Sequence, residues 1–451
     1  MSRLNTPVDP ARLLAARVIT ETVFEGAMVG EASDRHLTAS ALLPEARAFA
    51  TFLIFGTISY WLPLTYRLEA ISREPLSTMS KYVQSVLVLG AFQLEHAGSV
   101  PAYAAVDSSV RLAAYFAGAK VKPLTNALLR RLSADPPAYP RRAPGLPFGW
   151  PNELFGVLRA SYGENTALAI AEHSTLVQPW TTVRLNRRAA AGELPAGSLD
   201  PAIVVKPGRF AEGARRLLLK GRSPLMERAY AEGLMSLQND ASQLAVETAL
   251  RTNPGSILDI CAGHGGKTAA LAEKAGPQAV TAVEIDPGKR EQSEANLKRL
   301  GLWPLRQIEA DATDDLAGVL GQRYDLVLCD VPCSGLGVTA KKPEIRLRMT
   351  YDRIQELLPL QAAILDRAAH YVAPGGHLFY LTCTHNRQEN EAQADLFLAQ
   401  HPEYRPACLQ QWLPDALKDE AGGGFLNLFG HRHDVDGFFM AAFEYGGDDH
   451  E

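Results

Sequence analysis

The chain has 451 residues, of which 47% are hydrophobic and 21% are charged. This composition excludes a collagenous, mucin-like or globally disordered chain, and a length of about 150 residues per domain predicts roughly three domains. The formal net charge of -5 offers no overall basic field to a polyanion. Residues 1–250, however, carry 26 Lys and Arg against 21 Asp and Glu, whereas residues 251–451 carry 19 against 29. An anionic partner is therefore expected to meet the first half of the chain.

The chain has five cysteines, at positions 261, 329, 333, 383 and 408. This number is low for the length of the chain and it is odd, so a disulfide framework is not expected. No Cys-x-x-Cys pair occurs, so no metal site is predicted. The N-terminus lacks an apolar signal core. The uncharged stretch Ala48–Tyr66 contains Thr, Ser, Gly and Pro, which favours a buried bundle helix ending near Pro63 over a membrane span. We expect a reduced, cytoplasmic protein.

The first part of the chain is expected to be helical. Residues 1–133 carry apolar side chains at helical spacing and lack strand alternation, which predicts an all-α domain. Six prolines between Ala134 and Pro151 predict a linker, because proline interrupts helices and central strands. Residues 152–222 combine two expected helices with the strand-like pieces Trp180–Leu185 and Ala202–Val205, which predicts a small α+β subdomain.

Residues 223–451 are predicted to form a Rossmann-like α/β domain with a parallel sheet. Short apolar runs alternate there with helical stretches, at Ile257–Ile260, Ala279–Ile285, Tyr324–Cys329 and His377–Leu381. A helix around Ile354–Ala369 and a turn at Pro374-Gly375-Gly376 are expected before the last run, and a frayed acidic tail is expected at Gly446–Glu451. Ligands of such sheets bind at the carboxyl ends of the strands, so site residues are expected there.

A glycine-rich loop follows the first of these runs and reads Cys261-Ala262-Gly263-His264-Gly265-Gly266, before a helix that starts at Lys267. Its glycines allow close approach of a ligand, and the free N–H groups at the helix start favour an anion. The loop lacks one glycine of the Walker A motif and one of the dinucleotide fingerprint. S-adenosylmethionine (SAM) remains as a candidate, since Glu284 and Asp311 follow the next strands and suit ribose hydroxyls. The alternative is a loop that serves tight packing only.

Two further cysteines follow strands at the same edge of the predicted sheet. Asp330 and Cys333 come directly after the third apolar run, and Cys383 follows the fourth. Since the carboxyl ends of parallel strands meet at one edge, we expect these residues to face the glycine-rich loop. A single cysteine is more often a small buried side chain, which is how we interpret Cys329 and Cys408.

A thiol beside a methyl donor suits methylation of cytosine at its 5-carbon. That carbon is a poor nucleophile, but addition of a thiolate at the 6-carbon makes the ring enamine-like, so that the 5-carbon can attack a methyl group. A base must later remove the 5-hydrogen before the thiolate leaves. A carboxyl group that hydrogen-bonds the 3-nitrogen favours the addition, and Asp330 is placed for this role. The residues themselves leave open which cysteine attacks.

Several stretches resemble the motifs of the RNA cytosine-5 methyltransferases of the Nol1/Nop2/Sun family: Cys261–Thr268, Val283–Asp286, Asp330–Gly335, Thr382–Thr384, Arg387–Glu391 and Asp436–Phe439. The front domain resembles the NusB-type RNA-binding fold at residues 46–50, 100–106 and 126–131. This combination is similar to the bacterial 16S rRNA methyltransferase B group (Sun/Fmu). Gly263-His264 stands where the family usually has Ala-Pro, Glu284 where it has aspartate, and Thr384 where it has serine.

The resemblance implies a SAM-dependent rRNA cytosine-5 methyltransferase with a covalent cysteine–cytosine intermediate. It implies that Cys383 is the nucleophile and that Cys333 assists release of the methylated RNA, while Asp330 is the third catalytic candidate. It also implies a SAM site lined by Cys261, Ala262, Gly263, His264, Gly265, Gly266, Lys267, Glu284, Asp311 and Asp330. The expected partner is rRNA with a single-stranded or extruded cytosine, because the ring must reach the thiolate. Neither a membrane nor a metal is expected as a partner, and the chain is expected to be a monomer.

Other functions are considered beside this one. A SAM-dependent methyltransferase of a small molecule is disfavoured by the proline-rich hinge and the helical RNA-type domain, whereas another RNA such as tRNA is a closer alternative. A non-catalytic RNA-binding ribosome-assembly factor is disfavoured because both cysteines are present. The basic residues after the Cys333 motif either hold phosphates or form a solvated helix surface: Lys341, Lys342, Arg346 and Arg348.

Overall fold

Residues 8–175, 180–189 and 193–446 are described by the structure, a computed structural model of the chain. They pack into two units. Unit 1 comprises the described residues of Met1–Gln178, Lys220–Ser223 and Thr339–Met349, and unit 2 comprises those of Pro179–Leu219, Pro224–Val338 and Thr350–Glu451. The sequence-based boundaries at 133, 151 and 222 stay predictions, and the expected frayed tail lies outside the described residues beyond Gly446.

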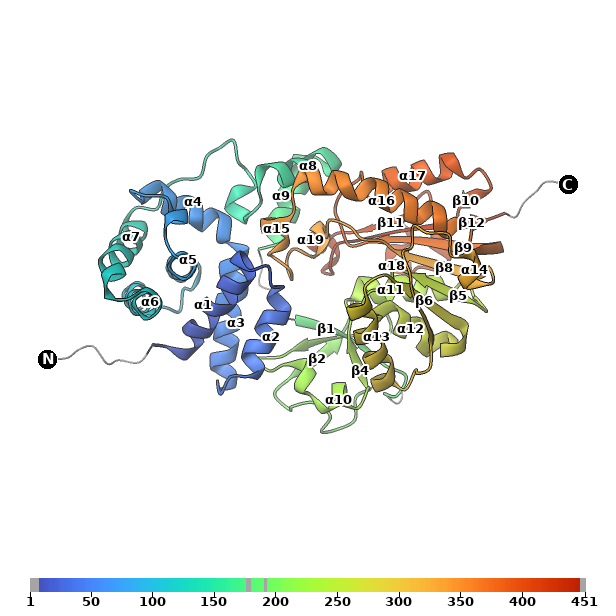
Figure 1. Cartoon of the computed structure of the whole chain (residues 1–451), viewed down its shortest axis with the longest axis horizontal. Helices are drawn as coiled ribbons and strands as arrows, with labels where there is room; N and C mark the ends of the chain where they lie inside the picture. The colour runs from blue at the N-terminus through green and yellow to red at the C-terminus, as the bar shows by residue number, and fades with distance from the viewer. Residues whose placement is uncertain (1–7, 176–179, 190–192, 447–451) are drawn as a thin grey trace. The chain divides into compact units, whose positions relative to one another are not determined.

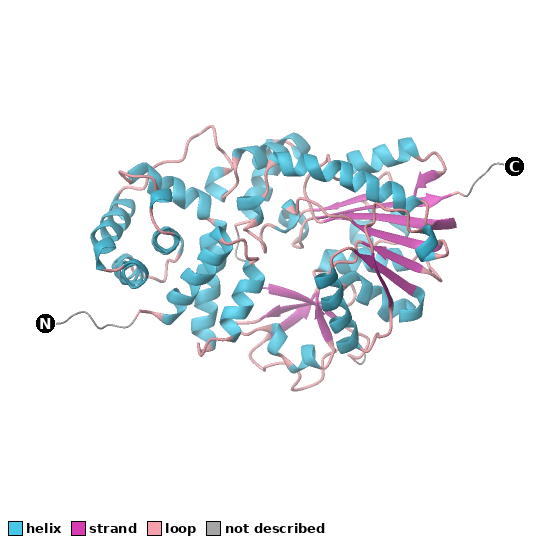
Figure 2. Ribbon diagram, in the orientation of Figure 1, coloured by secondary structure: helices cyan, strands magenta, loops and turns pink. Residues whose placement is uncertain are grey.

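Unit 1 is built from helices (Figures 1 and 2). They are α1 (Pro10–Phe24), α2 (Val29–Thr38), α3 (Pro44–Ser59), α4 (Trp61–Ile71), α5 (Lys81–His96), α6 (Ala102–Ala117), α7 (Lys122–Ala134), α8 (Asn152–Tyr162), α9 (Glu164–His173) and α15 (Ile345–Arg348). Asp9 and Ser80 cap α1 and α5 by accepting hydrogen bonds from backbone N–H groups, as short polar side chains do at helix starts. At Gly56 of α3 an added Cβ would lie 2.1 Å from the ring of Phe92 on α5, so the two helices cross closely there. The all-α fold predicted for the front of the chain is confirmed.

The uncharged stretch Ala48–Tyr66 forms the end of α3 and the start of α4, which meet at a bend of 70°. The expected helix end near Pro63 is wrong, because α3 ends at Ser59 and the proline lies in the first turn of α4. A proline there loses no helical hydrogen bond, since the first N–H groups of a helix lack a partner. Leu53 and Leu64 are fully buried in the bundle core. Among the described residues no single helix is long and apolar enough to cross a membrane, although α3 and α4 together pass that test as a bent pair.

The proline-rich segment 134–151 is anchored in unit 1 at its end. Trp150 is fully buried, and its indole N–H donates to Ser174 Oγ at 2.8 Å. The guanidinium of Arg346, which is 1% exposed, donates to the carbonyl oxygen of Phe148 at 2.5 Å. The residues after the Cys333 motif therefore pack in the helical unit through a buried arginine.

Two of the four basic residues considered for phosphate binding have a different role. Arg346 is too deeply buried to reach a phosphate, and Arg348 donates to the carbonyl oxygens of Thr22 and Ala27 at 2.6 Å each. Both sequence interpretations of Arg346, a phosphate contact or a solvated surface, are wrong. These contacts could not be read from the local sequence, because the backbone carbonyl oxygens that accept from the two guanidinium groups come from residues far away in the chain.

Unit 2 contains a small antiparallel sheet of order β2-β3-β1-β4. Its strands are β1 (Trp180–Leu185), β2 (Val204–Pro207), β3 (Ala214–Leu218) and β4 (Met235–Leu237). The strand expected at Trp180–Leu185 is confirmed. The piece expected from Ala202 begins two residues later, because Asp200 accepts hydrogen bonds from the N–H groups of Ala202 and Ile203 and holds them in a turn.

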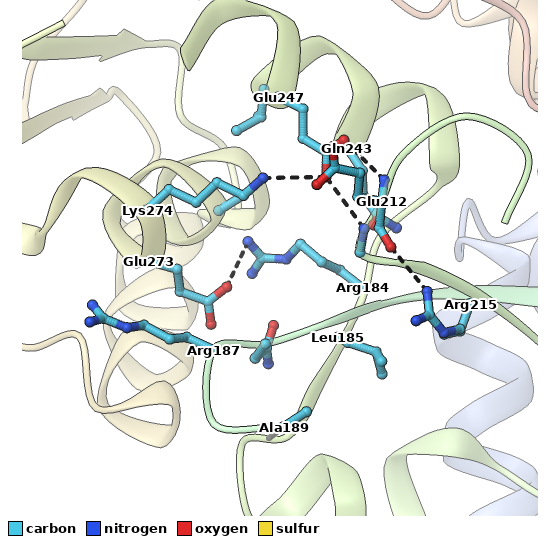
Figure 3. A pocket seen from close by; sticks show the side chains of 14 residues that line it. Arg184, Leu185, Arg187, Ala189, Glu212, Arg215, Gln243, Glu247, Glu273 and Lys274 are labelled. Atoms are coloured by element: carbon cyan, nitrogen blue, oxygen red, sulfur yellow. Dashed lines mark hydrogen bonds and ion pairs between the residues drawn. The ribbon is translucent and has the colours of Figure 1, made fainter. Parts of the chain in front are cut away.

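A buried ion pair connects the small sheet to the helix α12 (Gly266–Ala275), which lies next to α11 (Asp240–Leu250). Arg184 of β1 lies 3.0 Å from Glu273 of α12, and the two side chains are 8% and 9% exposed. Figure 3 shows them facing each other beside a cavity of about 570 Å³. Burial lowers the pKa of Arg184, and the attraction of Glu273 opposes this. Because α12 begins at the glycine-rich loop, this pair helps to hold the helix that carries the loop.

Replacement of Arg184 by methionine is expected to lower the free energy of unfolding by about 3–5 kcal/mol, because the Glu273 carboxylate would stay buried without its partner. Urea denaturation followed by circular dichroism measures this loss. The double variant R184M/E273M removes both charges and is expected to recover most of the stability. A single variant as stable as the unmodified chain would contradict the assignment.

The large sheet of unit 2 has the order β10-β12-β9-β8-β5-β6-β7, with β11 paired to β12. Its strands are β5 (Ile257–Ile260), β6 (Val280–Glu284), β7 (Arg306–Glu309), β8 (Tyr324–Asp330), β9 (Val372–Thr382), β10 (Tyr404–Pro406), β11 (Phe425–Leu428) and β12 (Phe438–Tyr445). The five strands from β7 to β9 are parallel, and β12 runs antiparallel to β9. The predicted parallel Rossmann-like sheet is confirmed.

One expected turn lies inside a strand. Pro374-Gly375-Gly376 belongs to β9, which starts at Val372. The pairing of β8 with β9 shifts register between Tyr324 and Leu326, so the Pro-Gly-Gly residues are accommodated as an irregularity of the ladder.

Helices cover both faces of this sheet (Figures 1 and 2). The side chains of β8 alternate between two cores, with Leu328 packed on the face of α11 and α12, and Val327 on the face of α16 (Tyr351–Ala369) and α17 (Glu391–Gln400). Cys329 is fully buried, as interpreted from the sequence. Cys408 is exposed, so its interpretation as a buried residue is wrong; it lies in the connection after β10, outside the sheet.

The strand order creates a topological switch point between β5 and β8. The chain runs from β5 through β6 to β7 on one side, and from β8 to β9 on the other. The loops that follow β5 and β8 therefore diverge, and such a point is where open α/β sheets bind ligands.

Candidate active site

The glycine-rich loop after β5 has left-handed backbone at Cys261, Gly263 and Gly265, with φ of 65°, 58° and 75°. Gly265 is the N-cap of α12, and an added Cβ there would lie 2.1 Å from Ser293 Oγ. At Gly263 and Gly266, in contrast, an added Cβ would meet no atom within 4 Å. The loop thus packs tightly at one glycine and leaves open space beside two others. Burial raises the pKa of the Cys261 thiol, so this cysteine stays protonated.

Acidic side chains stand at the ends of the next two strands. Glu284 Oε2 accepts a hydrogen bond from Gly263 N at 2.7 Å, and its Oε1 accepts from Asp286 N at 3.0 Å. Asp311 follows β7 and accepts from the N–H and the hydroxyl of Thr313, which lower the pKa of the aspartate. Glu284 at the end of β6 is paired with Glu309 at the end of β7, and Asp311 follows Glu309 by two residues. Glu284 and Asp311 therefore lie at the same edge of the sheet as the glycine-rich loop.

Lys267, in the first turn of α12, forms an ion pair with Asp330 at the end of β8. Burial by itself lowers the pKa of Lys267, but the attraction of Asp330 outweighs it and raises this pKa above its ordinary value. Cys383 contributes to the same shift, so a thiolate there and the Lys267 ammonium attract each other. The lysine therefore remains charged and connects the glycine-rich loop to the Asp330 strand end.

The structure brings Cys333 and Cys383 together, with their sulfur atoms 3.4 Å apart. The backbone N–H of Cys383 also donates to Cys333 Sγ at 3.3 Å. The hydrogen bond with Cys383, followed by burial, raises the pKa of Cys333 well above its ordinary range. A thiolate at Cys333 is therefore disfavoured, and its S–H can donate to Cys383 Sγ.

The remaining predicted site residues occupy the same edge of the sheet. Ala262 N donates to the carbonyl oxygen of Val283 at 2.9 Å, which connects the loop to β6, and His264 is exposed.

Sequence reasoning missed Glu389 and Asn390 as site residues, although their stretch resembles a family motif. Both are fully buried beside the two cysteine loops. The available signal was an acid–amide pair just after the Thr-Cys strand end. Among the described residues, no group of three or more His, Cys, Asp or Glu side chains could hold a metal ion.

This sheet order, with a glycine-rich loop and strand-end acids at the switch point, is the architecture of the Rossmann-like methyltransferases. The family model of the 16S rRNA methyltransferase RsmB/F matches residues 248–444, and that of the NusB family matches residues 9–134. A Synechocystis sp. protein named "Probable ribosomal RNA small subunit methyltransferase B" is 30% identical over 441 residues, which cover 96% of this chain and 98% of that protein. The chain therefore belongs to the 16S rRNA methyltransferase RsmB/F family, and the front of it is a NusB domain.

A second relative agrees with this family, and a solved structure agrees with the fold. The Vibrio cholerae ribosomal RNA small subunit methyltransferase B is 32% identical over 348 residues, covering 75% of this chain and 79% of that protein. The crystal structure of PH0851 has the same fold, with a TM-score of 0.80 and 21% identity, and the match covers 98% of this chain and 100% of that one. The resemblance found in the sequence is confirmed, and the chain is an RNA methyltransferase.

Proposed function

We propose that this enzyme methylates the 5-carbon of a cytosine in small-subunit rRNA in the cytoplasm, with SAM as methyl donor and a covalent cysteine–cytosine intermediate. The observation that supports this most directly is the 3.4 Å approach of the Cys333 and Cys383 sulfur atoms. The names of the two relatives support rRNA of the small subunit as the substrate. The target cytosine has to be unpaired or extruded, because a stacked base cannot present its 6-carbon to a thiolate.

The glycine-rich loop fits SAM. The open space at Gly263 and Gly266 lets a carboxylate approach the free N–H groups at the start of α12. Each oxygen of Glu284 accepts one backbone hydrogen bond and keeps lone pairs for ribose hydroxyls. Ile285, which is 58% exposed, offers an apolar surface to an adenine ring. When bound, SAM supplies an electrophilic methyl group; we assign its site to Cys261, Ala262, Gly263, His264, Gly265, Gly266, Lys267, Glu284, Asp311 and Asp330.

We assign the attack to Cys383. Its thiolate forms a bond to the 6-carbon of cytosine, and the electron pair of the 5,6 double bond becomes available at the 5-carbon. Cys333 suits this step less well, because burial and the hydrogen bond with Cys383 raise the pKa of its thiol. The ammonium of Lys267 stabilises the thiolate by charge, and the Asp330 carboxylate accepts a hydrogen bond at the 3-nitrogen edge of the ring once that nitrogen carries a proton.

Release of the product reverses the addition. Once the 5-carbon carries the methyl group, a base removes the 5-hydrogen as a proton. The electron pair of the broken carbon–hydrogen bond restores the 5,6 double bond, and the bond between the 6-carbon and Cys383 Sγ breaks. The leaving sulfur becomes a thiolate again, and the S–H of Cys333, 3.4 Å away, stabilises this charge by a hydrogen bond. This is the assistance that we assign to Cys333.

Incubation with tritium-labelled SAM and small-subunit rRNA from a strain that lacks the enzyme is expected to label cytosine. Digestion to nucleosides and chromatography should recover the label as 5-methylcytidine, because the thiolate activates only the 5-carbon. Total tRNA from the same strain serves as the matched substrate control, and preferential labelling of tRNA would move the substrate to that class. If no RNA accepts label, the proposed activity is wrong and a non-catalytic assembly role is favoured.

A further inference from the structure

A buried carboxyl side chain that accepts hydrogen bonds from neutral donors lies beside the two cysteines. Glu389 is 0% exposed, and among the described residues its side chain accepts only from neutral donors, which belong to Ser334, Gln361 and Asn386. Burying an ionised carboxylate is costly unless hydrogen bonds satisfy it. A carboxyl group at this place needs a reason beyond packing, since an amide or an apolar side chain would be cheaper to bury.

Glu389 holds the loop of Cys333. Its Oε1 accepts from the backbone N–H of Ser334 at 2.8 Å, and its Oε2 accepts from the Ser334 hydroxyl at 2.5 Å. Gln361 of α16 donates from one amide nitrogen to Glu389 Oε1 at 3.1 Å and to the carbonyl oxygen of Pro332 at 2.9 Å. The residues on both sides of Cys333 are thus tied to this carboxylate.

The same network reaches the loop of Cys383. Ser334 Oγ lies 2.6 Å from Thr384 Oγ1, and because the serine hydroxyl donates to Glu389, the threonine hydroxyl donates to the serine. Asn390 accepts from Thr382 Oγ1 at 2.6 Å and donates to the carbonyl oxygen of Thr384 at 3.0 Å. The residues that flank Cys383 are therefore fixed by the amide next to Glu389.

We propose that Glu389 is a positioning residue of the methylation reaction, which sets the approach of the two sulfur atoms and uses its negative charge to disfavour a thiolate at Cys333. This inference rests on the proposed function, because it explains how two adjacent thiols obtain different roles. It assigns to Glu389 no contact with RNA or SAM.

The charges around Cys333 agree with this role. The thiol faces the Cys383 sulfur, the Glu389 carboxylate, the Tyr380 hydroxyl of β9 and, beyond Cys383, the ion pair of Lys267 and Asp330. The hydrogen bond with Cys383, burial and the charge of Glu389 all raise the pKa of Cys333, whereas the backbone N–H of Cys383 lowers it. Burial raises the pKa of the Tyr380 hydroxyl well above its usual range, so it stays neutral.

Alkylation of Cys333 by iodoacetamide as a function of pH tests the charge directly. In the full chain with Cys383→Ser, the rate at Cys333 is followed by mass spectrometry with and without Glu389→Gln. The glutamine keeps the shape and removes the charge, so the pH of half-maximal alkylation is expected to fall by about one unit. Asp240→Asn is the matched control, because Asp240 is another buried carboxylate bound by neutral backbone N–H groups, on α11. An unchanged profile for Glu389→Gln, or an equal shift for Asp240→Asn, would overturn the proposal.

Activity tests the positioning. In the chain with both cysteines, Glu389→Ala is expected to lower kcat for RNA methylation about 100-fold, since misplacement of reacting groups by about 1 Å has this effect. The KM for SAM should stay unchanged, because the Glu389 side chain bonds to Ser334, Gln361 and Asn386 and these residues lie outside the glycine-rich loop. Methylation at the unmodified rate would overturn the proposal. If the unmodified chain itself methylates no RNA, the proposed function fails, and the alkylation profile still decides the role of Glu389.

Discussion

Replacement of Cys383 by alanine is expected to lower methyl transfer to RNA by about four orders of magnitude or more, as loss of a covalent nucleophile does in other enzymes. Without the sulfur, no bond forms to the 6-carbon, and the 5-carbon of cytosine remains a poor nucleophile. Single-turnover transfer of labelled methyl groups to small-subunit rRNA measures the effect. Cys408→Ala is the control, because this exposed cysteine lies outside the sheet and its loss should leave the rate unchanged.

The cysteine variants also decide between the two possible nucleophiles. The roles would be reversed if Cys383→Ala still methylates RNA, whereas Cys333→Ala neither methylates RNA nor forms a trapped intermediate. The structure favours the present assignment because the hydrogen bond with Cys383 and burial disfavour a thiolate at Cys333.

Replacement of Cys333 by alanine is expected to leave a covalent RNA–protein adduct. Attack by Cys383 and transfer of the methyl group would still proceed, but the leaving sulfur would lose the S–H donor that lies 3.4 Å away. The adduct should migrate as a slower band on a denaturing gel and carry label from tritiated SAM. Turnover should fall while the first methylation event persists.

The double variant C333A/C383A is the control for the adduct, because it keeps the loss at Cys333 and removes the attacking sulfur. It is expected to form no slow band. An adduct of equal yield in this double variant would mean that another residue attacks, and an absence of adduct in Cys333→Ala with normal turnover would remove Cys333 from the release step.

Much of the fold and of the candidate site was predictable from the sequence, because the relevant signals are local. Buried parallel strands require short apolar runs, and Ile257–Ile260 and Tyr324–Cys329 are mostly apolar, with one aspartate in each. The strand ends could be located on the chain, and parallel strands share one edge for their carboxyl ends. Hence the glycine-rich loop, Asp330 and the two cysteine motifs could be expected at one place before any distance was known.

Other features depend on contacts between residues far apart in the chain, which no local pattern contains. Arg346 has the composition of a surface residue and is buried because carbonyl oxygens of unit 1 bind its guanidinium. Glu389 looks like an ordinary helix-start acid, and only its bonds to Ser334, 55 positions away, show that it holds the Cys333 loop.

The amino-acid sequence by itself determined the class of fold, the order of the strand ends and the residue types that meet there, because apolar periodicity and glycine conformation act over a few neighbours. Only the tertiary structure decided the spacing of the two sulfur atoms and the surroundings that raise the pKa of Cys333. Those properties depend on burial and on charges brought together by the sheet and its helices, and a thiol responds to its surroundings in space and not to its neighbours in sequence.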